Sequence, residues 1–314
     1  MRVLVTGGFG FTGTAVVRRL TSATHEVVAL THRPPEAPAP AWWAGEVVHA
    51  DVRDARAVLA AVSEVDAVCH LAALSLARES FERPVEYWQV NATGTRTLVD
   101  ALTSKAAKSG RPVPLVHAST HAVYGAPEHQ PIAEDTPLAP ISPYGQSKAA
   151  AEDAVAAASR TGAVSAICLR LFNVAGAVAG LTDTEQSRIV PKALAVAAGR
   201  APILEINGDG RAVRDFVHVE DVADAFLLAL AACRQNAYAI YNVGASAASM
   251  LDVIMVTEQI TGRTIRIIHN PPKAEPAVMI ADTTRIKSEL SWTPERSSLS
   301  QIIADAWNVI LRQP

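Results

Sequence analysis

The sequence predicts an α/β fold, in which a doubly wound parallel sheet is combined with a smaller, discontinuous C-terminal lobe. The sheet is predicted by short valine-rich runs that alternate with alanine-rich helical stretches. This alternation is typical of parallel strands joined by crossover helices. After about residue 175 the rhythm becomes irregular, which predicts that the later segments build the second lobe.

The individual elements follow from local patterns, taken in chain order. Runs of β-branched and other apolar residues predict strands over 2–7, 26–31, 46–51, 66–73, 114–120 and 164–172. The stretches between them predict helices over 13–23, 54–63, 91–110 and 144–162. In a doubly wound sheet, ligands bind beyond the carboxyl ends of the strands, so the functional residues are expected at that edge.

Composition narrows the class of protein. The 314 residues are 49 % hydrophobic and 19 % charged, as in ordinary globular chains, and the formal net charge is −3 without a block of like charges. Neither nucleic acid nor a membrane surface is therefore an expected partner. The chain opens on a predicted strand and lacks the roughly 18 consecutive apolar residues of a membrane span, so a cytoplasmic location is expected. Three separated cysteines, Cys69, Cys168 and Cys233, favour buried reduced thiols over disulfides or metal ligands, and no metal site is expected.

The first chemical motif is "TGGFGFTG", residues 6–13, in which Gly7, Gly10 and Gly13 recur every three residues between a predicted strand and a predicted helix. Glycine at these positions permits a tight turn, close approach of backbone N–H groups to a pyrophosphate, and close helix packing. The positive end of the helix dipole attracts the same anion. The motif therefore predicts a dinucleotide site.

The second motif is "SPYGQSK", in which Tyr144 and Lys148 lie four residues apart and share one helix face. A tyrosine exchanges protons near neutral pH only if its pKa, about 10 in water, is lowered. A neighbouring ammonium group lowers it by favouring the phenolate. The pair therefore predicts an acid/base site downstream of the glycine motif.

These motifs resemble those of extended short-chain dehydrogenases/reductases, and within them the nucleotide-sugar epimerase/dehydratase family of the UDP-glucose 4-epimerase type. The resemblance spans nearly the whole chain and includes "TGGFGFTG", "ADVRD", "HLAA", "NATGT", "STHAVYG", "YGQSK", "LRLFNVAG", "GDGRAVRDFVHVEDVADA", "YNVGAS" and "ELSWTP". It implies an NAD(P)-binding Rossmann domain over 1–174, to which segments at roughly 215–245 return. It also implies that 175–314 form mainly a smaller substrate-binding lobe.

The resemblance also implies roles for single residues. Tyr144 is expected to exchange a proton with the sugar, Lys148 to bind the nicotinamide ribose and lower the pKa of Tyr144, and Thr120 to hydrogen-bond the same sugar oxygen. The implied cofactor-binding residues are Gly7, Gly10, Phe11, Gly13, Asp51, Val52, Leu71, Ala72, Ala73, Asn91, Tyr144 and Lys148. The implied substrate-binding residues are Thr120, His121, Asn173 and Arg214.

Some positions keep a second interpretation. Asn173 is either a diphosphate ligand or a turn-forming residue after a strand. Arg214 is either a diphosphate ligand or the partner of Asp215 in a surface ion pair. His218 is interpreted as a packed structural histidine rather than a catalyst.

Two departures from the family pattern bear on the reaction. His121 and Ala122 stand where family dehydratases have an Asp-Glu pair, which disfavours dehydration. His121 is then a substrate contact, an auxiliary base or a solvent-facing histidine. Near the C-terminus, Pro272 stands where many relatives have a diphosphate-binding arginine, and Lys273 is a candidate replacement.

The choice between NAD and NADP depends on the end of the second predicted strand. A carboxylate there binds the adenosine ribose hydroxyls and repels a 2′-phosphate, so it selects NAD. This chain has Thr31 at that point and Arg33 two residues later. Thr31 removes the repulsion and Arg33 supplies a cation, so both are predicted to bind the cofactor, and NADP is suggested beside NAD. Alternatively, Arg33 points to water.

The expected function is that of an NAD(P)-dependent nucleotide-sugar epimerase, which acts at C4 of a nucleotide-diphosphate sugar through a transient 4-keto intermediate. One alternative is an NADPH-dependent reductase of nucleotide-linked 4-keto sugars, and another is a non-catalytic NADP-sensing regulator. Because relatives commonly dimerise through two helices per subunit, a homodimer through 93–107 and 147–160 is also expected.

Overall fold

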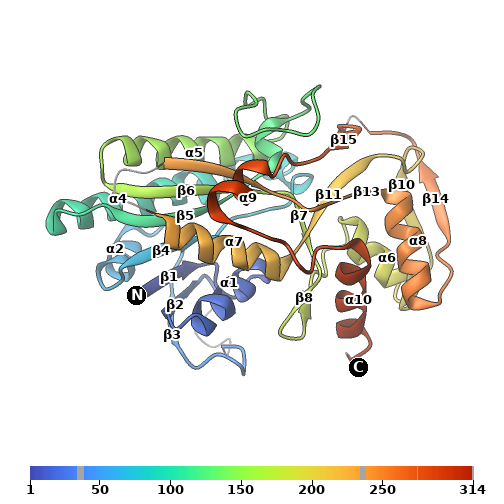
Figure 1. Cartoon of the computed structure of the whole chain (residues 1–314), viewed down its shortest axis with the longest axis horizontal. Coiled ribbons are helices and arrows are strands. Elements are labelled where there is room, and N and C mark those ends of the chain that lie inside the picture. The colour runs from blue at the N-terminus through green and yellow to red at the C-terminus, as the bar shows by residue number, and fades with distance from the viewer. Residues whose placement is uncertain (34–38, 234–237, 274, 313–314) are drawn as a thin grey trace. The chain divides into compact units, whose positions relative to one another are not determined.

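The computed structural model describes residues 1–33, 39–233, 238–273 and 275–312, and the chain divides into two units (Figure 1). Unit 1 comprises Met1–Gly125, Thr136–Leu171 and Ala223–Tyr241. Unit 2 comprises Ala126–Asp135, Phe172–Val222 and Asn242–Pro314. Each unit is therefore assembled from three separate stretches of sequence.

Unit 1 is built on a seven-stranded sheet in the order β12-β6-β5-β4-β1-β2-β3. The strands are β1 (Arg2–Thr6), β2 (Glu26–Thr31), β3 (Glu46–His49), β4 (Ala67–His70), β5 (Val113–Thr120), β6 (Val164–Leu171) and β12 (Tyr238–Val243). The six strands from β3 to β6 in this order pair in parallel. The strand order reverses between β1 and β4, which is where doubly wound sheets bind ligands. The predicted doubly wound sheet and its six strands are confirmed. No strand was predicted at the position of β12, which lies within the segments at roughly 215–245 that were expected to return to this domain.

Helices cover both faces of this sheet (Figure 1). The helices of this part of the chain are α1 (Phe11–Ser22), α2 (Ala55–Ser63), η1 (Glu79–Phe81), α3 (Pro84–Tyr87), η2 (Trp88–Thr93), α4 (Gly94–Ser109), η3 (His121–Tyr124), α5 (Pro143–Arg160) and α7 (Val219–Ala232). Apolar side chains of α2, α4 and α5 form one core cluster with the strands. All four predicted helices are present. The prediction over 91–110 is wrong for its first turn, because residues 88–93 are π-helical, and a 3.6-residue period does not register such a turn.

Unit 2 contains short strands and four helices in its described residues. The strands are β7 (Asn173–Ala175), β8 (Ala177–Val178), β9 (Leu181–Thr182), β10 (Leu204–Asn207), β11 (Val213–His218), β13 (Ser246–Ser249), β14 (Ile267–Asn270) and β15 (Val278–Met279). The helices are α6 (Ile189–Ala197), α8 (Met250–Thr261), α9 (Thr284–Leu290) and α10 (Leu299–Ile310). Strand β11 lies at the centre of one sheet, where it pairs with β7, β13 and β15.

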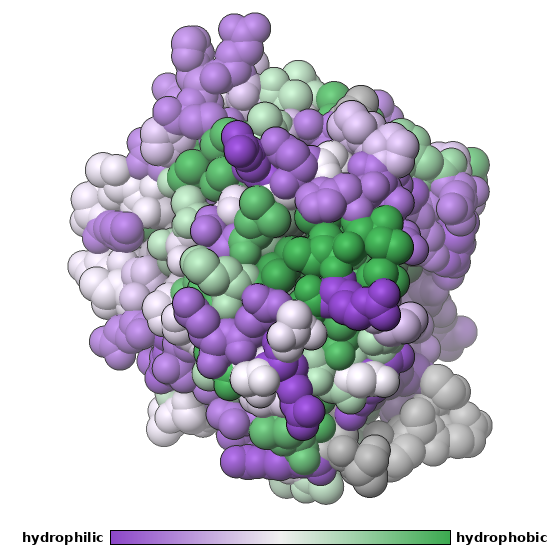
Figure 2. All heavy atoms as spheres, turned by 90° about the vertical axis from the view of Figure 1, so that its right-hand side faces the viewer, coloured by the Kyte–Doolittle hydropathy of each residue, from purple (hydrophilic) through white to green (hydrophobic). Residues whose placement is uncertain are grey.

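A hydrophobic area is visible on the side of the molecule where α8 and β14 lie (Figure 2). Three large apolar side chains of these elements are exposed, namely Leu251, Met255 and Ile268. In the described part of the chain, no helix has the length and apolar character needed to cross a membrane.

Candidate active site

Two close backbone approaches shape the glycine loop between β1 and α1. Gly7 has a φ of +69°, and a Cβ there would lie 2.9 Å from the backbone nitrogen of Ala72. A Cβ on Gly13 would lie 2.1 Å from the carbonyl oxygen of Gly7. Because both contacts are with backbone, the loop closes only when both residues are glycine.

The N-terminus of α1 fits a phosphate group. Its N-cap residue, Gly10, has no side-chain acceptor, and no acidic residue lies in the first turn. The N–H groups that begin at Phe11 therefore keep their hydrogen-bonding capacity, and the helix dipole adds positive potential. Among the described atoms, a Cβ on Gly10 would approach only the Gly7 carbonyl oxygen, at 3.3 Å. The loop thus leaves room beside its donors for the pyrophosphate of a dinucleotide.

A chain of hydrogen bonds fixes the segment after β4 against this loop. The Thr6 hydroxyl oxygen accepts from the N–H groups of Leu71 (3.2 Å) and Ala72 (3.1 Å), so its own proton is donated to Nδ1 of His70 (2.7 Å). Nε2 of His70 then carries a proton and donates to the Thr95 hydroxyl (2.9 Å). Burial lowers the pKa of His70 to about 3, so the ring is neutral. The three predicted cofactor contacts in this segment are half-buried: Leu71, Ala72 and Ala73.

The carboxyl end of β2 places a cation beside the glycine loop. Thr31 is buried, and its hydroxyl oxygen accepts a hydrogen bond from the N–H of Arg33 (3.2 Å). The Arg33 guanidinium turns back and donates through Nη2 to the carbonyl oxygen of Phe9 (2.9 Å), inside the loop. Arg33 is exposed, yet its charge is anchored at the glycine loop.

Asp51 and Val52 follow β3. The Asp51 carboxylate accepts two hydrogen bonds from the Arg53 guanidinium, at 2.9 and 2.6 Å, and these bonds lower the pKa of Asp51. Val52 is buried, and its Cγ2 would lie 2.7 Å from a Cβ on Gly94. Gly94 therefore lets the start of α4 approach Val52 closely.

Helix α5 carries the predicted acid/base pair. Ser142 caps the helix by accepting a hydrogen bond from the N–H of Gly145 (3.1 Å), and a proline occupies the first turn. Tyr144 and Lys148 lie one turn apart on the same face. The half-buried ring of Tyr144 packs edge-on against Tyr87, with ring centroids 6.2 Å apart.

Thr120 ends β5 beside the first turn of α5. It is buried, and its hydroxyl oxygen accepts a hydrogen bond from the N–H of Ala122 (3.2 Å). A Cβ on Gly145 would lie only 2.5 Å from the carbonyl oxygen of Ala122, so the turn after Thr120 and the helix are in backbone contact. The structure therefore brings Thr120 and the turn of α5 that carries Tyr144 together.

Lys148 is almost fully buried, with 3 % of its surface exposed. Desolvation lowers its pKa to about 8, and the negative charge of Glu152 opposes that shift. The ammonium form therefore prevails at pH 7 and is lost as the pH rises through about 8. Near neutral pH its charge favours the phenolate form of a neighbouring tyrosine.

A buried ion pair that sequence reasoning missed ties α5 to the sheet. The Glu152 carboxylate accepts hydrogen bonds from Nε (3.0 Å) and Nη2 (2.7 Å) of Arg170 in β6, and another from the Ser119 hydroxyl. Arg170 also donates through Nη1 to the Tyr124 hydroxyl (2.8 Å). One signal pointed to Glu152: it lies one turn after Lys148, on the same helix face as the acid/base pair.

Asn91 also positions α5. It is fully buried in the π-helical turn, and its amide nitrogen donates to the Leu74 carbonyl oxygen (2.9 Å) and the Ser147 hydroxyl (3.0 Å). Its amide oxygen accepts a hydrogen bond from the Leu74 N–H (2.9 Å). Asn91 therefore reaches the acid/base pair through Ser147, which directly precedes Lys148. Single π turns occur frequently at functional sites.

Two of the predicted substrate residues lie on neighbouring strands of unit 2. Asn173 in β7 donates through Nδ2 to the carbonyl oxygen of Asp215 in β11 (2.9 Å). Arg214 donates to the Val213 carbonyl oxygen (2.9 Å), and its Nη2 lies 3.6 Å from a carboxylate oxygen of Glu275. Because consecutive strand residues point to opposite faces, Arg214 and Asp215 diverge.

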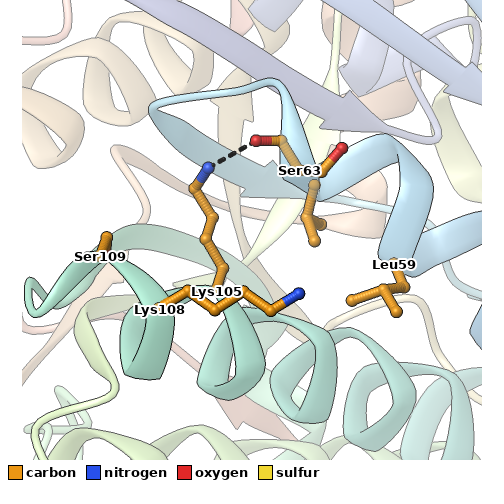
Figure 3. Close-up of a pocket in the computed structure, with 6 residues that line it drawn as sticks. Leu59, Ser63, Lys105, Lys108 and Ser109 are labelled. Carbon is orange, nitrogen blue, oxygen red and sulfur yellow. Dashed lines mark hydrogen bonds between the residues drawn. The ribbon is translucent and has the colours of Figure 1, made fainter.

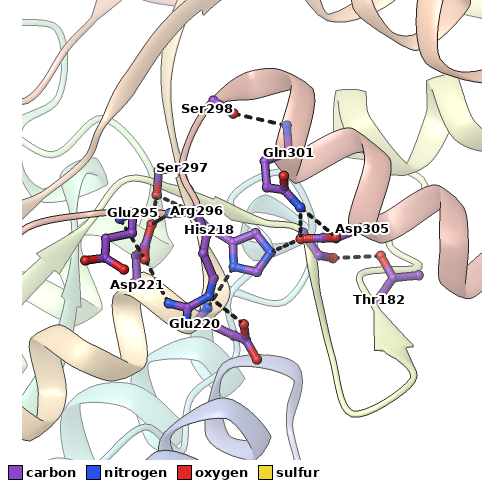
Figure 4. Close-up of polar contacts among 11 residues, drawn as sticks. Thr182, His218, Glu220, Asp221, Glu295, Arg296, Ser297, Ser298, Gln301 and Asp305 are labelled. Carbon is purple, nitrogen blue, oxygen red and sulfur yellow. Dashed lines mark hydrogen bonds and ion pairs between the residues drawn. The ribbon is translucent and has the colours of Figure 1, made fainter.

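The remaining sequence candidates differ in their surroundings. His121 is half-buried, and its Nδ1 lies 3.2 Å from the carbonyl oxygen of Leu171, at the end of β6. His218 is fully buried in unit 2, where Nδ1 accepts a hydrogen bond from the N–H of Glu220 (3.1 Å) and Nε2 lies 3.3 Å from a carboxylate oxygen of Asp305 (Figure 4). Pro272 and Lys273 follow β14 and are exposed.

A surface pocket in unit 1 lies away from these residues. It is lined by Leu59, Val62, Ser63, Lys105, Lys108 and Ser109, from the later parts of α2 and α4 (Figure 3). In this fold the crossover helices end near the amino ends of the strands. The pocket therefore lies at the opposite edge of the sheet from the predicted site residues, which follow the carboxyl ends of the strands. The described residues hold no group of three or more His, Cys, Asp or Glu side chains arranged for a metal ion.

Comparison with known proteins identifies the family. The model of the NAD dependent epimerase/dehydratase family matches residues 3–244. A UDP-glucose 4-epimerase from Corynebacterium glutamicum is 34 % identical over 321 residues, which cover 98 % of this chain and 95 % of that protein. UDP-arabinose 4-epimerase 1 from Arabidopsis thaliana is 31 % identical, over 97 % of this chain and 78 % of that protein.

Solved structures agree with the sequence relatives. A UDP-glucose 4-epimerase from Stenotrophomonas maltophila, with bound NAD and formylated UDP-arabinopyranose, is similar with a TM-score of 0.89 and 32 % identity. The similarity covers 98 % of this chain and 97 % of that one. With the family match and relatives at this identity along nearly the whole length, the protein belongs to the NAD-dependent epimerase/dehydratase family.

Proposed function

We propose that the protein is an NAD(P)-dependent nucleotide-sugar epimerase, acting at C4 through a transient 4-keto intermediate. The observation that carries the proposal is the packing of Thr120 beside the turn of α5 that presents Tyr144 and the buried Lys148. Relatives at 34 % identity are UDP-glucose 4-epimerases. The packing of these three residues and the names of the relatives both support proton and hydride exchange at a sugar carbon.

Tyr144, Lys148 and Thr120 have different tasks. Tyr144 takes the proton from the sugar C4 hydroxyl and later returns it. Lys148, as an ammonium, lowers the pKa of Tyr144 and binds the nicotinamide ribose, and Thr120 hydrogen-bonds the reacting sugar oxygen. When bound, the dinucleotide supplies a reversible hydride acceptor. The chain's own contribution is therefore to hold the sugar hydroxyl and to move its proton.

The cofactor is held by the glycine loop and the neighbouring strand ends. The N–H groups that begin at Phe11 would hold its pyrophosphate, and Asp51 and Val52 would contact its adenosine. Relatives of solved structure bind NAD. In this chain Thr31 offers no carboxylate, and the guanidinium of Arg33 is held at the glycine loop, which supports acceptance of NADP beside NAD.

The substrate is a nucleotide-diphosphate sugar. Asn173 and Arg214 contact its diphosphate, because an amide donor and a guanidinium suit phosphate oxygens. His121 contacts the sugar. The sequence relatives act on UDP-sugars by name, which supports a uridine nucleotide.

Reduction of nucleotide-linked 4-keto sugars is the second candidate, and the Arg33 contact favours it, because a reductase consumes NADPH in each cycle. An NADP-sensing regulator is disfavoured, since a sensor needs no lysine buried beside a tyrosine. The prediction of a cytoplasmic location stays a prediction.

A homodimer through α4 and α5 is part of the proposal. Just before α4, three apolar side chains are exposed: Phe81 (62 %), Val85 (68 %) and Trp88 (48 %). They lie in η1, α3 and η2, three short elements that lead into α4, and exposed apolar side chains beside α4 suit a second copy of the chain. Light scattering is expected to give the mass of a dimer, and Val85→Glu is expected to reduce it to that of a monomer.

The test of the acid/base assignment is Tyr144→Phe, which removes the hydroxyl and keeps the ring. Turnover of UDP-glucose is expected to fall by at least about a hundredfold, with cofactor binding retained. The matched control is Tyr87→Phe, which removes the hydroxyl of the neighbouring tyrosine, keeps the ring contact and is expected to retain turnover. Full activity of Tyr144→Phe would refute the assignment.

A further inference from the structure

A second tyrosine packs against the proposed acid/base residue. Tyr87 ends α3, and its ring meets that of Tyr144 nearly at a right angle, with centroids 6.2 Å apart and an interplanar angle of 84°. Tyr87 is fully buried, whereas Tyr144 is half-buried. Perpendicular ring pairs at this separation are favourable beyond the apolar area that they bury. Tyr87 therefore supports one side of the Tyr144 ring.

Two hydrogen bonds fix the hydroxyl of Tyr87. It donates to Oε2 of Glu79 (2.7 Å) and accepts from the N–H of Leu76 (3.1 Å). Hydrogen bonds from Tyr87 and Arg83 lower the pKa of Glu79, so the acceptor is a carboxylate at neutral pH. Both ends of the Tyr87 side chain are thus held, the ring by burial and the hydroxyl by the segment that follows β4.

The two tyrosines differ in their surroundings. Burial, followed by the hydrogen bond to Glu79, raises the pKa of Tyr87 above its usual range, so this phenol stays protonated near neutral pH. Tyr144 instead shares a helix face with the ammonium group of Lys148, which favours a phenolate. Tyr87 is therefore a neutral and fixed neighbour of the tyrosine that is proposed to exchange a proton.

The place of Tyr144 in α5 leaves its ring in need of an outside constraint. Tyr144 is the second residue of the helix, directly after Pro143. Inside a helix, the preceding turn restricts the rotamers of each side chain. No helical turn of α5 precedes Tyr144, so neighbouring elements must determine the orientation of its ring.

A second contact joins the same two segments. Asn91, four residues after Tyr87, donates to the hydroxyl of Ser147 (3.0 Å), three residues after Tyr144. Residues three or four apart lie on one side of a helix, and both α3 and η2 pack on α5. The Asn91 contact holds the helix at Ser147, whereas the Tyr87 contact acts on the Tyr144 ring itself.

We propose that Tyr87 is a positioning residue for Tyr144, and that its fixed ring holds the Tyr144 ring in one orientation on the helix face that carries Lys148. The orientation matters because the ammonium charge favours the ionised form of Tyr144 only while the phenol stays near it. The catalytic consequence rests on the proposed function, whereas the effect on the Tyr144 ring does not.

A titration of Tyr144 tests this role without turnover. The chain has five tyrosines, so labelling with ¹³C at Cζ gives five signals, and Tyr144→Phe identifies that of Tyr144. Tyr87→Leu removes the supporting ring, and the Tyr144 midpoint is expected to rise by at least about half a pH unit, because a mobile phenol spends less time near Lys148. Tyr87→Phe keeps the buried ring and is expected to keep the midpoint of the unmodified protein.

A matched control separates positioning from lost packing. Leu20 is fully buried in α1, which packs on β1 and β2. Leu20→Ala leaves a cavity there and is expected to lower thermal stability without moving the Tyr144 midpoint. An unchanged or lowered midpoint in Tyr87→Leu, or an equal rise in Leu20→Ala, would overturn the proposal.

Turnover tests the catalytic consequence. In Tyr87→Leu, kcat for UDP-glucose is expected to fall at least about tenfold, because a misplaced acid/base group slows the chemical step. KM is expected to change little, since Tyr87 is fully buried. If the midpoint moves as expected while the unmodified protein does not turn over UDP-sugars, the positioning role stands and the proposed function fails.

A second measurement covers the case in which Tyr87→Leu does not fold. In the unmodified protein, vicinal couplings are expected to show a single χ1 rotamer for Tyr144, and nuclear Overhauser effects are expected between the protons of the two rings. A Tyr144 side chain that averages over several rotamers would overturn the proposal.

Discussion

Glu152 lies one helical turn after Lys148, and its carboxylate receives two hydrogen bonds from Arg170 in β6, at 3.0 and 2.7 Å. The side chains of Glu152 and Arg170 are 4 % and 3 % exposed. The helix that carries the acid/base pair is therefore held to the sheet by a desolvated ion pair. Such a pair is costly to break, because one charge is then left buried without its partner.

Arg170→Leu is expected to lower the free energy of unfolding by about 3–5 kcal/mol. The double variant Glu152→Leu with Arg170→Leu removes both charges and is expected to regain much of that loss. Urea unfolding measures both. The exposed pair of Arg96 and Asp100 on α4 provides the control, since Arg96→Leu is expected to change stability by less than about 1 kcal/mol. If the double variant lost as much unfolding free energy as the two single variants together, Glu152 and Arg170 would not stabilise each other.

Two glycines of the loop are expected to respond differently to the same substitution. Gly13→Ala forces a Cβ to 2.1 Å from the Gly7 carbonyl oxygen, so it is expected to destabilise the fold itself. Gly10→Ala meets that oxygen at 3.3 Å and is expected to fold nearly normally but to bind the dinucleotide weakly. Thermal unfolding and cofactor titration distinguish the two. Normal cofactor affinity in Gly10→Ala would place the pyrophosphate elsewhere.

Lys148 is expected to reduce stability at neutral pH. Burial lowers its pKa from 10.5 to about 8, so between these values the folded state binds fewer protons than the unfolded state. The contribution of Lys148 to stability therefore rises with pH across this window, and below it the buried ammonium is a cost. Lys148→Met is expected to abolish turnover while raising the free energy of unfolding at pH 7 by on the order of 2 kcal/mol.

The increase in the free energy of unfolding caused by Lys148→Met is expected to be smaller at pH 10 than at pH 7. At pH 10 the unmodified lysine is largely neutral in the folded state, so its burial costs less. Urea unfolding at the two pH values checks this. A variant less stable than the unmodified protein at pH 7 would show that the ammonium is held by compensating contacts.

Arg33 is expected to increase the affinity for NADPH without affecting the affinity for NADH. Arg33→Ala removes the cation at the glycine loop and is expected to weaken NADPH binding by about tenfold, the effect of one charge-assisted hydrogen bond. NADH binding is expected to change little. Arg18→Ala serves as the control, since Arg18 lies over the ring of Trp42 and is expected to affect neither cofactor. An equal loss of affinity for NADPH and NADH would mean that Arg33 contacts the adenine or stabilises the glycine loop, and does not bind the 2′-phosphate.

The local patterns of the sequence predicted the sheet and the four main helices, because apolar runs and helical faces are short-range features. They did not predict β12, which joins the sheet beside β6 from far along the chain. Nor did they predict the π-helical turn at 88–93, because one extra residue in a turn barely changes the hydrophobic pattern.

The residues of the candidate site likewise fall into those that local sequence patterns predict and those that they do not. The glycine loop and the pair on α5 were predictable because their spacing alone carries the chemistry. The contacts of Glu152 with Arg170 and of His70 with His117 join residues on different strands or helices. The register of β4 and β5 brings His70 and His117 together, and the packing of α5 on β6 brings Glu152 to Arg170. A single sequence shows neither.

In the proposed epimerisation, C4 of a nucleotide sugar is oxidised and then receives the same hydride back. The direct test is to incubate the purified protein, without added cofactor, with UDP-glucose that carries deuterium on C4. We expect conversion to the C4 epimer with the deuterium retained on that carbon. A requirement for added NADPH, or product that has lost the deuterium, would contradict epimerisation at C4 by this chain.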